Sequence, residues 1–147
     1  MTDNTAENMQ EPPKQPKRQI DLLFDDGLFG TDQRLAEDRY YAARRWFSDW
    51  SNSRFNTDFY AISGLSAADE NKLTAADRYL RAHWEIPLRA RNIANSVIIH
   101  DMSIDEYMRR YPIFNGTNDE RIILIRLLWS ACDGLVTAYN IIKQMKE

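Results

Sequence analysis

Three side chains in the sequence belong to the types that most often do chemistry at neutral pH: His83, His100 and Cys132. Neither histidine has a second metal ligand at a suitable spacing, and no HExxH or CxxC pattern is present. Cys132 is the only cysteine and lies in an apolar helical stretch, where a small core side chain is typical. We therefore expect no metal site and no intramolecular disulfide, and a lone cysteine fits a reducing cytoplasm.

The motifs of the common enzyme classes are also missing from the sequence. It has no G-x-S-x-G nucleophile elbow, no phosphate-binding glycine-rich loop and no dinucleotide-binding pattern, and its five glycines allow few tight ligand-binding turns. Carboxylates are abundant, but no neighbouring pair stands in an apolar stretch that would raise the pKa of one member. We expect a protein that is not an enzyme and holds no cofactor, which leaves binding as its function.

The composition is that of one globular domain. Hydrophobic residues make up 44% and aromatic residues 12% of the 147 residues, which is enough for one packed core. The formal net charge of −3 argues against coating nucleic acid by bulk charge, but it allows a local basic patch. Arginine outnumbers lysine by 14 to 5. This bias fits a contact surface, because arginine makes forked contacts, and it equally fits a GC-rich genome.

The N-terminal residues 1–19 are polar and contain Pro12, Pro13 and Pro16, so we expect a disordered, solubilising tail rather than a secretory signal. The most apolar run of the chain, 122–129, is short and interrupted by Arg126. A membrane span needs about 20 apolar residues. We therefore expect a cytoplasmic protein with no membrane contact.

Residues 20–30 form an arm in which apolar side chains alternate with acidic ones. This pattern has two interpretations. The arm could dock on another protein, or it could fold back onto the core of its own domain, which we favour. The candidate partner-binding residues are Leu22, Leu23, Phe24, Leu28 and Phe29.

The single domain, residues 31–147, is predicted to be all-α. Between 31 and 50 one helical face carries Ala36, Tyr40, Ala43, Phe47 and Trp50. We expect residues 51–65 to form an ordered loop. Residues 66–69 and 74–77 both have the sequence of a capping box, and the second begins a helix that Pro87 must end or kink. The helical pattern then resumes at Leu88, and its predicted inward residues are Ala90, Ile93, Ala94, Val97 and Ile98.

The C-terminal part has two more helix starts. A capping box at 103–106 begins a short helix that ends near Tyr111-Pro112, and Asn115-Gly116 signals a turn. A further capping box at 117–120 begins a helix that runs to Lys146, about 40 Å at 1.5 Å per residue. Because this long helix is apolar on more than one face, other elements must cover it. Either the rest of the domain or a second copy of the chain supplies that cover, and we expect a homodimer.

The helix order from Leu88 onward is that of a helix-turn-helix, whose last helix offers its start to the DNA major groove. The candidate DNA-binding residues on this interpretation are Arg89, Arg91, Arg109, Arg110, Asn118 and Arg121. Two features oppose it. The turn from 111 to 117 is longer than usual, and the presumed recognition end carries Asp119 and Glu120, which repel phosphates.

Residues 73–140 contain three features that form one pattern: the stretch from Arg78 to Arg91, the apolar helix 93–99 and the closing apolar pattern 127–139. In this pattern they resemble an uncharacterised helical domain of alphaproteobacterial and phage-like transcriptional regulators, including gene-transfer-agent activators. Upstream, residues 35–50 are similar to the opening helix of that domain. The resemblance implies transcriptional regulation, through double-stranded DNA or through assembly with the transcription machinery. The sequence thus predicts a DNA-associated regulator, and the alternative is a protein-binding adaptor of a phage or mobile element.

Overall fold

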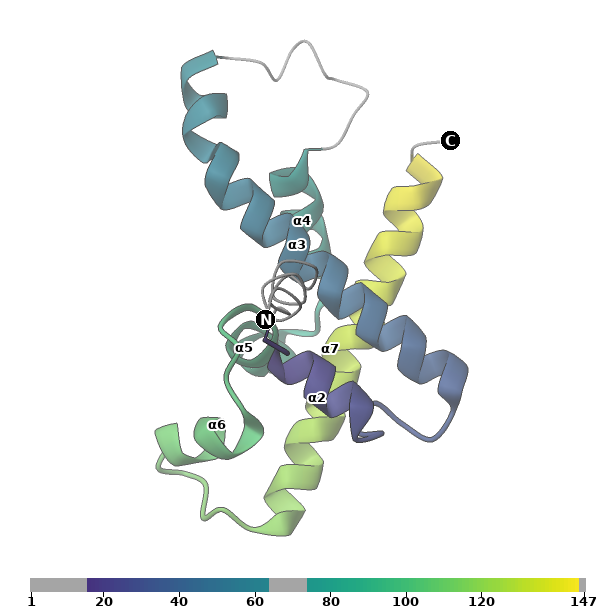
Figure 1. The fold of residues 1–147 in the computed structure, drawn as a ribbon, viewed down its shortest axis with the longest axis vertical. Coiled ribbons are helices and arrows are strands. Elements are labelled where there is room, and N and C mark those ends of the chain that lie inside the picture. The colour runs from purple at the N-terminus through teal and green to yellow at the C-terminus, as the bar shows by residue number, and fades with distance from the viewer. Residues whose placement is uncertain (1–15, 64–73, 146–147) are drawn as a thin grey trace, which may run out of the picture.

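The structure, a computed structural model, describes residues 16–63 and 74–145, and these fold into helices with no strand among them. This confirms the predicted all-α class. The two long helices, α3 (Gln33–Ser63) and α7 (Asn118–Met145), cross near their middles (Figure 1). The shorter elements pack around the crossing: α2 (Gln19–Asp25), α4 (Ala75–Glu85), the 3₁₀-helix η2 (Leu88–Ala90), α5 (Arg91–Ala94), the π-helix η3 (Asn95–Ile99) and α6 (Ile104–Arg110).

Helix α7 is the long apolar C-terminal helix that the sequence predicts. Its start is fixed by the expected capping box: the Thr117 amide donates to Glu120 Oε1 at 2.9 Å, and the Glu120 amide donates to Thr117 Oγ1 at 3.2 Å. Within the described residues, α7 is also long and apolar enough to cross a membrane by length and composition. Helices α3, α4, α5 and α6 all pack along it, however, which is the arrangement of a core helix.

Helix α3 is longer than predicted. The expected helix over 31–50 is present, but the expected loop over 51–65 is wrong, because the helix continues to Ser63. The polar residues there suggested a loop, yet no glycine or proline lies between Gly30 and Gly64 to end the helix. Of the predicted inward face, Ala36 and Ala43 are buried and the three aromatic residues are half-buried against the core.

The segment from α4 to η3 follows the sequence closely. The Thr74 capping box is present, with the Asp77 amide donating to Thr74 Oγ1 at 3.1 Å, and α4 ends two residues before Pro87. All five predicted inward residues, Ala90, Ile93, Ala94, Val97 and Ile98, are buried. The pattern is not one helix, though, since the chain passes through 3₁₀, α and π turns in succession. The other predicted capping box, at 66–69, lies outside the described residues.

Helix α4 approaches α7 closely at Gly134. A Cβ atom at this position would lie 2.5 Å from the Glu85 carbonyl oxygen and 3.2 Å from the Ile86 Cα. Both are backbone atoms at the end of α4, so no side-chain rotation could relieve the contact. The end of α4 can therefore rest on α7 only because residue 134 has no side chain.

A buried carboxylate joins the three main helices. Asp49 of α3 is only 4% exposed; it accepts from Arg78 Nε of α4 at 3.0 Å and from the Tyr139 hydroxyl of α7 at 2.8 Å. Burial first, and then the Asp49 charge, raises the pKa of Tyr139 far above its ordinary value, so the phenol stays a donor. This network fixes how α3, α4 and α7 sit against one another.

The last residues of the predicted disordered tail are ordered. Arg18 donates from one guanidinium nitrogen to the carbonyl oxygens of Ile98 and Ile99, at 2.9 and 3.0 Å, and stacks 3.6 Å from the Phe47 ring centroid. The carbonyl oxygens at the end of a helix lack hydrogen-bond donors within the helix. The Arg18 guanidinium is the donor for two such oxygens of η3. The tail prediction is therefore wrong for Arg18 and Gln19, and residues 1–15 lie outside the described residues.

Candidate functional site

We consider first the histidines, the cysteine and the carboxylates of the described residues 16–63 and 74–145. No three His, Cys, Asp or Glu side chains there gather in a way that could hold a metal ion. Cys132 is buried, and this burial raises the pKa of its thiol far above the ordinary range. Burial and the nearby Arg91 charge lower the pKa of His83, which lies among the rings of Trp46, Tyr79 and Trp84.

One candidate binding region is the end of the molecule formed by α6, the 111–117 turn and the first turns of α7. We call residues 104–126 the α6–α7 end. The Glu120 carboxylate holds its turn in place by accepting from the amides of Asn115 and Thr117 at 2.9–3.1 Å. These bonds, the Thr117 amide first, lower the pKa of Glu120, so the turn stays fastened at neutral pH.

Two of the six candidate DNA-binding residues are engaged in the fold. Arg91 Nε donates to the Ile86 carbonyl oxygen at 3.0 Å, and its guanidinium stacks 4.9 Å from the Trp84 ring. It therefore closes the end of α4. Arg121 forms an ion pair with Asp105, which ties the start of α7 to α6.

The other four candidates, Arg89, Arg109, Arg110 and Asn118, are exposed. The structure does not bring all six together. Arg109 and Arg121 line one hollow of about 350 Å³ with Asp105 and Phe114, whereas Arg110 lines another beside His100 and Glu106. Arg89 belongs to η2, a different element. The connection from Tyr111 to Thr117 has seven residues, so a helix-turn-helix stays a proposal.

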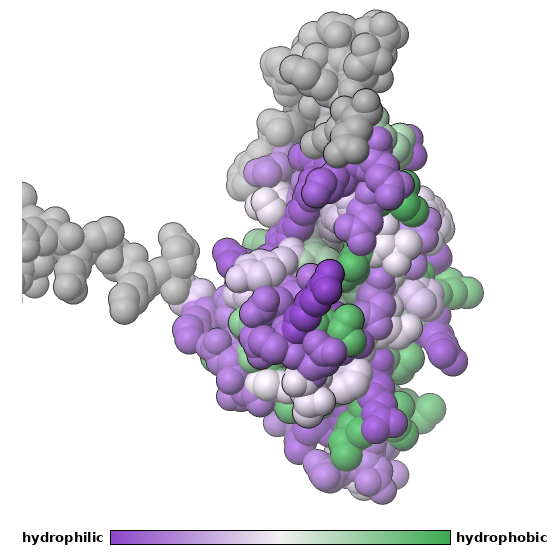
Figure 2. Space-filling model, turned by 90° about the vertical axis from the view of Figure 1, so that its right-hand side faces the viewer, coloured by the Kyte–Doolittle hydropathy of each residue, from purple (hydrophilic) through white to green (hydrophobic). Residues whose placement is uncertain are grey.

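Sequence reasoning missed the most prominent feature of the α6–α7 end, which is apolar. Ile113 is 81% exposed, Ile123 59% and Ile122 43%. Figure 2 shows hydrophobic side chains gathered at the lower end of the molecule, where α7 begins. Both isoleucines of α7 were expected to be covered, because helical apolar patterns predict burial. The signal that could have found Ile113 is its place in a turn, directly after Pro112.

The candidate partner-binding residues of the arm mostly pack on their own domain. Phe29 is 1% exposed, so it is not available to a partner, while Leu23 and Phe24 are half-buried against the core. Phe24 stacks on Tyr40 with ring centroids 4.3 Å apart. Leu22 and Leu28 remain exposed at 41% and 37%. Of the two interpretations of the arm, the structure therefore shows the fold-back for Leu23, Phe24 and Phe29.

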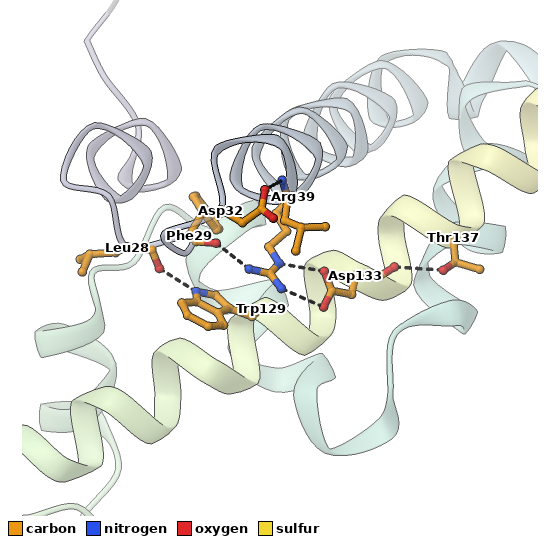
Figure 3. A network of polar contacts seen from close by, with 8 residues as sticks. Leu28, Phe29, Asp32, Arg39, Trp129, Asp133 and Thr137 are labelled. Carbon is orange, nitrogen blue, oxygen red and sulfur yellow. Dashed lines mark hydrogen bonds and ion pairs between the residues drawn. The ribbon is translucent and has the colours of Figure 1, made fainter.

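A polar cluster fastens the end of the arm to both long helices (Figure 3). Arg39 of α3 donates to the Phe29 carbonyl oxygen at 2.6 Å and to Asp133 of α7 at 2.8 Å. Trp129 Nε1 donates to the Leu28 carbonyl oxygen at 2.6 Å, and Arg39 lies over the Trp129 ring at 4.7 Å. The Arg39 side chain is only 12% exposed, so these contacts hold it against the fold.

No family model matches the chain, and no curated protein or solved structure is significantly similar to it.

Proposed function

We propose that this protein is a non-enzymatic binding protein that contacts another protein through its α6–α7 end. The observation that carries the proposal is the exposure of Ile113, Ile122 and Ile123 at that end. Single exposed apolar residues are common, but several at one end of a molecule, here in the turn and on α7, mark interaction surfaces.

These three isoleucine side chains are not needed to fill the core or to hold the local fold. Leu124 and Leu128 already fill the positions of α7 that face the core, and both are buried. Full burial of an isoleucine side chain contributes about 1.5–3 kcal/mol, so a partner that covers the three would gain considerable stability. The surface is also rigid, because Glu120 fixes the turn and Arg121 pairs with Asp105. A rigid surface loses little conformational entropy when it binds.

The resemblance to regulator domains supports a partner in the transcription machinery, and a second copy of the chain is the other partner to test. The Ile113→Asp/Ile123→Asp double variant should keep its stability within about 0.5 kcal/mol per site, because both side chains are exposed. It should lose complex formation, measured as the mass of the protein in solution with and without a candidate partner. A matched control, Asn140→Asp on the exposed side of α7, should leave the complex unchanged. Equal binding by both variants would contradict the proposal.

A second candidate function is contact with DNA, and it rests on two adjacent arginines. Arg109 and Arg110 are exposed at the end of α6, and neither makes an ion pair with another described residue. Such residues fit contacts to phosphates, which position a protein without reading base sequence. Exposed Asp119 at the start of α7 opposes this function.

The salt dependence of binding to random duplex DNA tests the second function. Binding should weaken steeply as salt rises, and Arg109→Ala/Arg110→Ala should reduce the slope of log K against log salt by about 1 per lost contact. Arg34→Ala, an exposed arginine of α3, is the control. Absence of measurable binding at low salt would rule out DNA contact and leave the protein-binding proposal intact.

A further inference from the structure

A second apolar surface lies on α4 and on η2, which follows it, away from the α6–α7 end. Leu80, Trp84 and Leu88 follow one another at four-residue spacing and are 49%, 64% and 78% exposed. We call these residues the Trp84 stripe. We propose that the Trp84 stripe docks an acidic amphipathic segment of a partner protein, meaning a helix with apolar side chains on one face and carboxylates beside them.

The fold leaves this stripe uncovered. Ala82 of α4 and Ile86, which follows the helix, are buried, and α4 packs on α3 and α7. At 100° per residue, Trp84 points away from both, and Leu80 lies on its side of the helix. An exposed tryptophan flanked by exposed leucines has no role in the core, and it is the kind of anchor that dominates the energy of protein interfaces.

Trp84 is nevertheless held in one orientation. The Arg91 guanidinium stacks 4.9 Å from its ring centroid and donates to the Trp84 carbonyl oxygen at 3.4 Å, while His83 meets the ring edge-on at 5.1 Å. Because the ring is already ordered, binding would cost little side-chain entropy. Tryptophan and arginine together at one surface are typical of interface hot spots.

The charged side chains around the Trp84 stripe favour a partner segment of opposite charge. Arg81 and Arg89 are exposed beside it, and Arg91 is half-exposed. The acidic neighbours are Glu85 and Asp77, and the Asp77 carboxylate also caps the start of α4 by accepting from the Thr74 amide. Counting Arg81, Arg89 and Arg91 against Glu85 and Asp77, the balance is one positive charge. Carboxylates on the partner would meet these arginines, whereas a basic partner would be repelled.

The stripe is separate from the surface of the proposed function. Glu85 contacts α7 at Gly134, eleven residues beyond Ile123, which is about 16 Å along the helix. A protein with two such surfaces could bridge two partners. The two proposals stand independently, since each rests on its own residues.

Titration of the full chain with a designed helical peptide tests the proposal. The peptide carries leucine on three successive turns with glutamate on both flanks, and a second version has lysine flanks. The glutamate peptide should bind saturably and the lysine peptide should not. Trp84→Ala should weaken binding about 30-fold, the effect of a 2 kcal/mol hot spot. Arg81→Gln/Arg89→Gln should weaken it at low salt more than at high salt.

The control is Ile123→Asp, which should bind the glutamate peptide like the unaltered protein. Because Trp84 is exposed, its substitution should leave the thermal unfolding midpoint nearly unchanged, and this is measured alongside. The proposal is overturned if the glutamate peptide does not bind, if it binds Trp84→Ala equally well, or if single-stranded nucleic acid binds at Trp84 in its place.

Discussion

Replacing Asp49 by alanine should lower the free energy of unfolding by about 3–5 kcal/mol, because it breaks a buried ion pair by removing one partner. Asp49 is 4% exposed and bonds to Arg78 and Tyr139 from two other helices. Its loss takes the carboxylate acceptor from both, and leaving a buried donor unsatisfied is costly. For a domain of this size, such a change is a large share of the total stability.

Urea unfolding followed by circular dichroism measures the effect. Tyr139→Phe is the matched control, since it removes one neutral donor and leaves the Arg78 pair with Asp49 in place. Its cost should be about 1–2 kcal/mol, clearly less than that of Asp49→Ala. If Asp49→Ala cost no more than Tyr139→Phe, the carboxylate would not hold the three helices together as the structure shows.

Gly134→Ala should destabilise the protein, although alanine is normally the better helix residue. In an open helix this change would stabilise by about 1 kcal/mol. At Gly134 the new Cβ would meet the Glu85 carbonyl oxygen at 2.5 Å, so α4 must move away from α7. Overpacking of a tight contact costs about 1–3 kcal/mol, and this outweighs the gain in helix propensity. We expect a net loss of up to about 2 kcal/mol.

Thr137→Ala, one turn further along α7 and exposed, is the control for helix propensity. It should be neutral or slightly stabilising. Thermal unfolding of the two variants separates the effects, and Gly134→Val should be worse than Gly134→Ala because valine is larger and β-branched. A stabilised Gly134→Ala would mean that α4 and α7 are further apart than the structure places them.

Local signals in the sequence predicted most of the helices. Helix boundaries were correctly predicted from the capping boxes at Thr74 and Thr117 and from Pro87, which ends a helix. These residues act on the nearest backbone groups, so their effect can be inferred from the local sequence. The inward residues from Ala90 to Ile98 followed from periodicity alone. The failure over 51–63 has the same origin, since polar composition is only a correlate of loops and no helix-breaking residue was present.

The candidate site was less predictable, because it depends on partners far apart in the chain. Arg91 and Arg121 looked free to bind phosphates, but the fold brings them to Ile86 and Asp105. Arg39 likewise donates to Phe29 and Asp133, contacts that no local pattern indicates. The exposure of an apolar side chain also depends on elements far away in the sequence. The same apolar pattern buries Leu124 and exposes Ile123, and the elements that pack on α7 decide which.

The most direct test of the proposed protein contact is position-specific cross-linking in the cell. A photoreactive residue at position 123 should form adducts with a defined protein, whose mass also distinguishes a second copy of the chain from another partner. The same residue at position 140, on an exposed part of α7, should not. Specific adducts at 123 that disappear in the Ile113→Asp variant are the predicted result, and adducts no stronger at 123 than at 140 would contradict it.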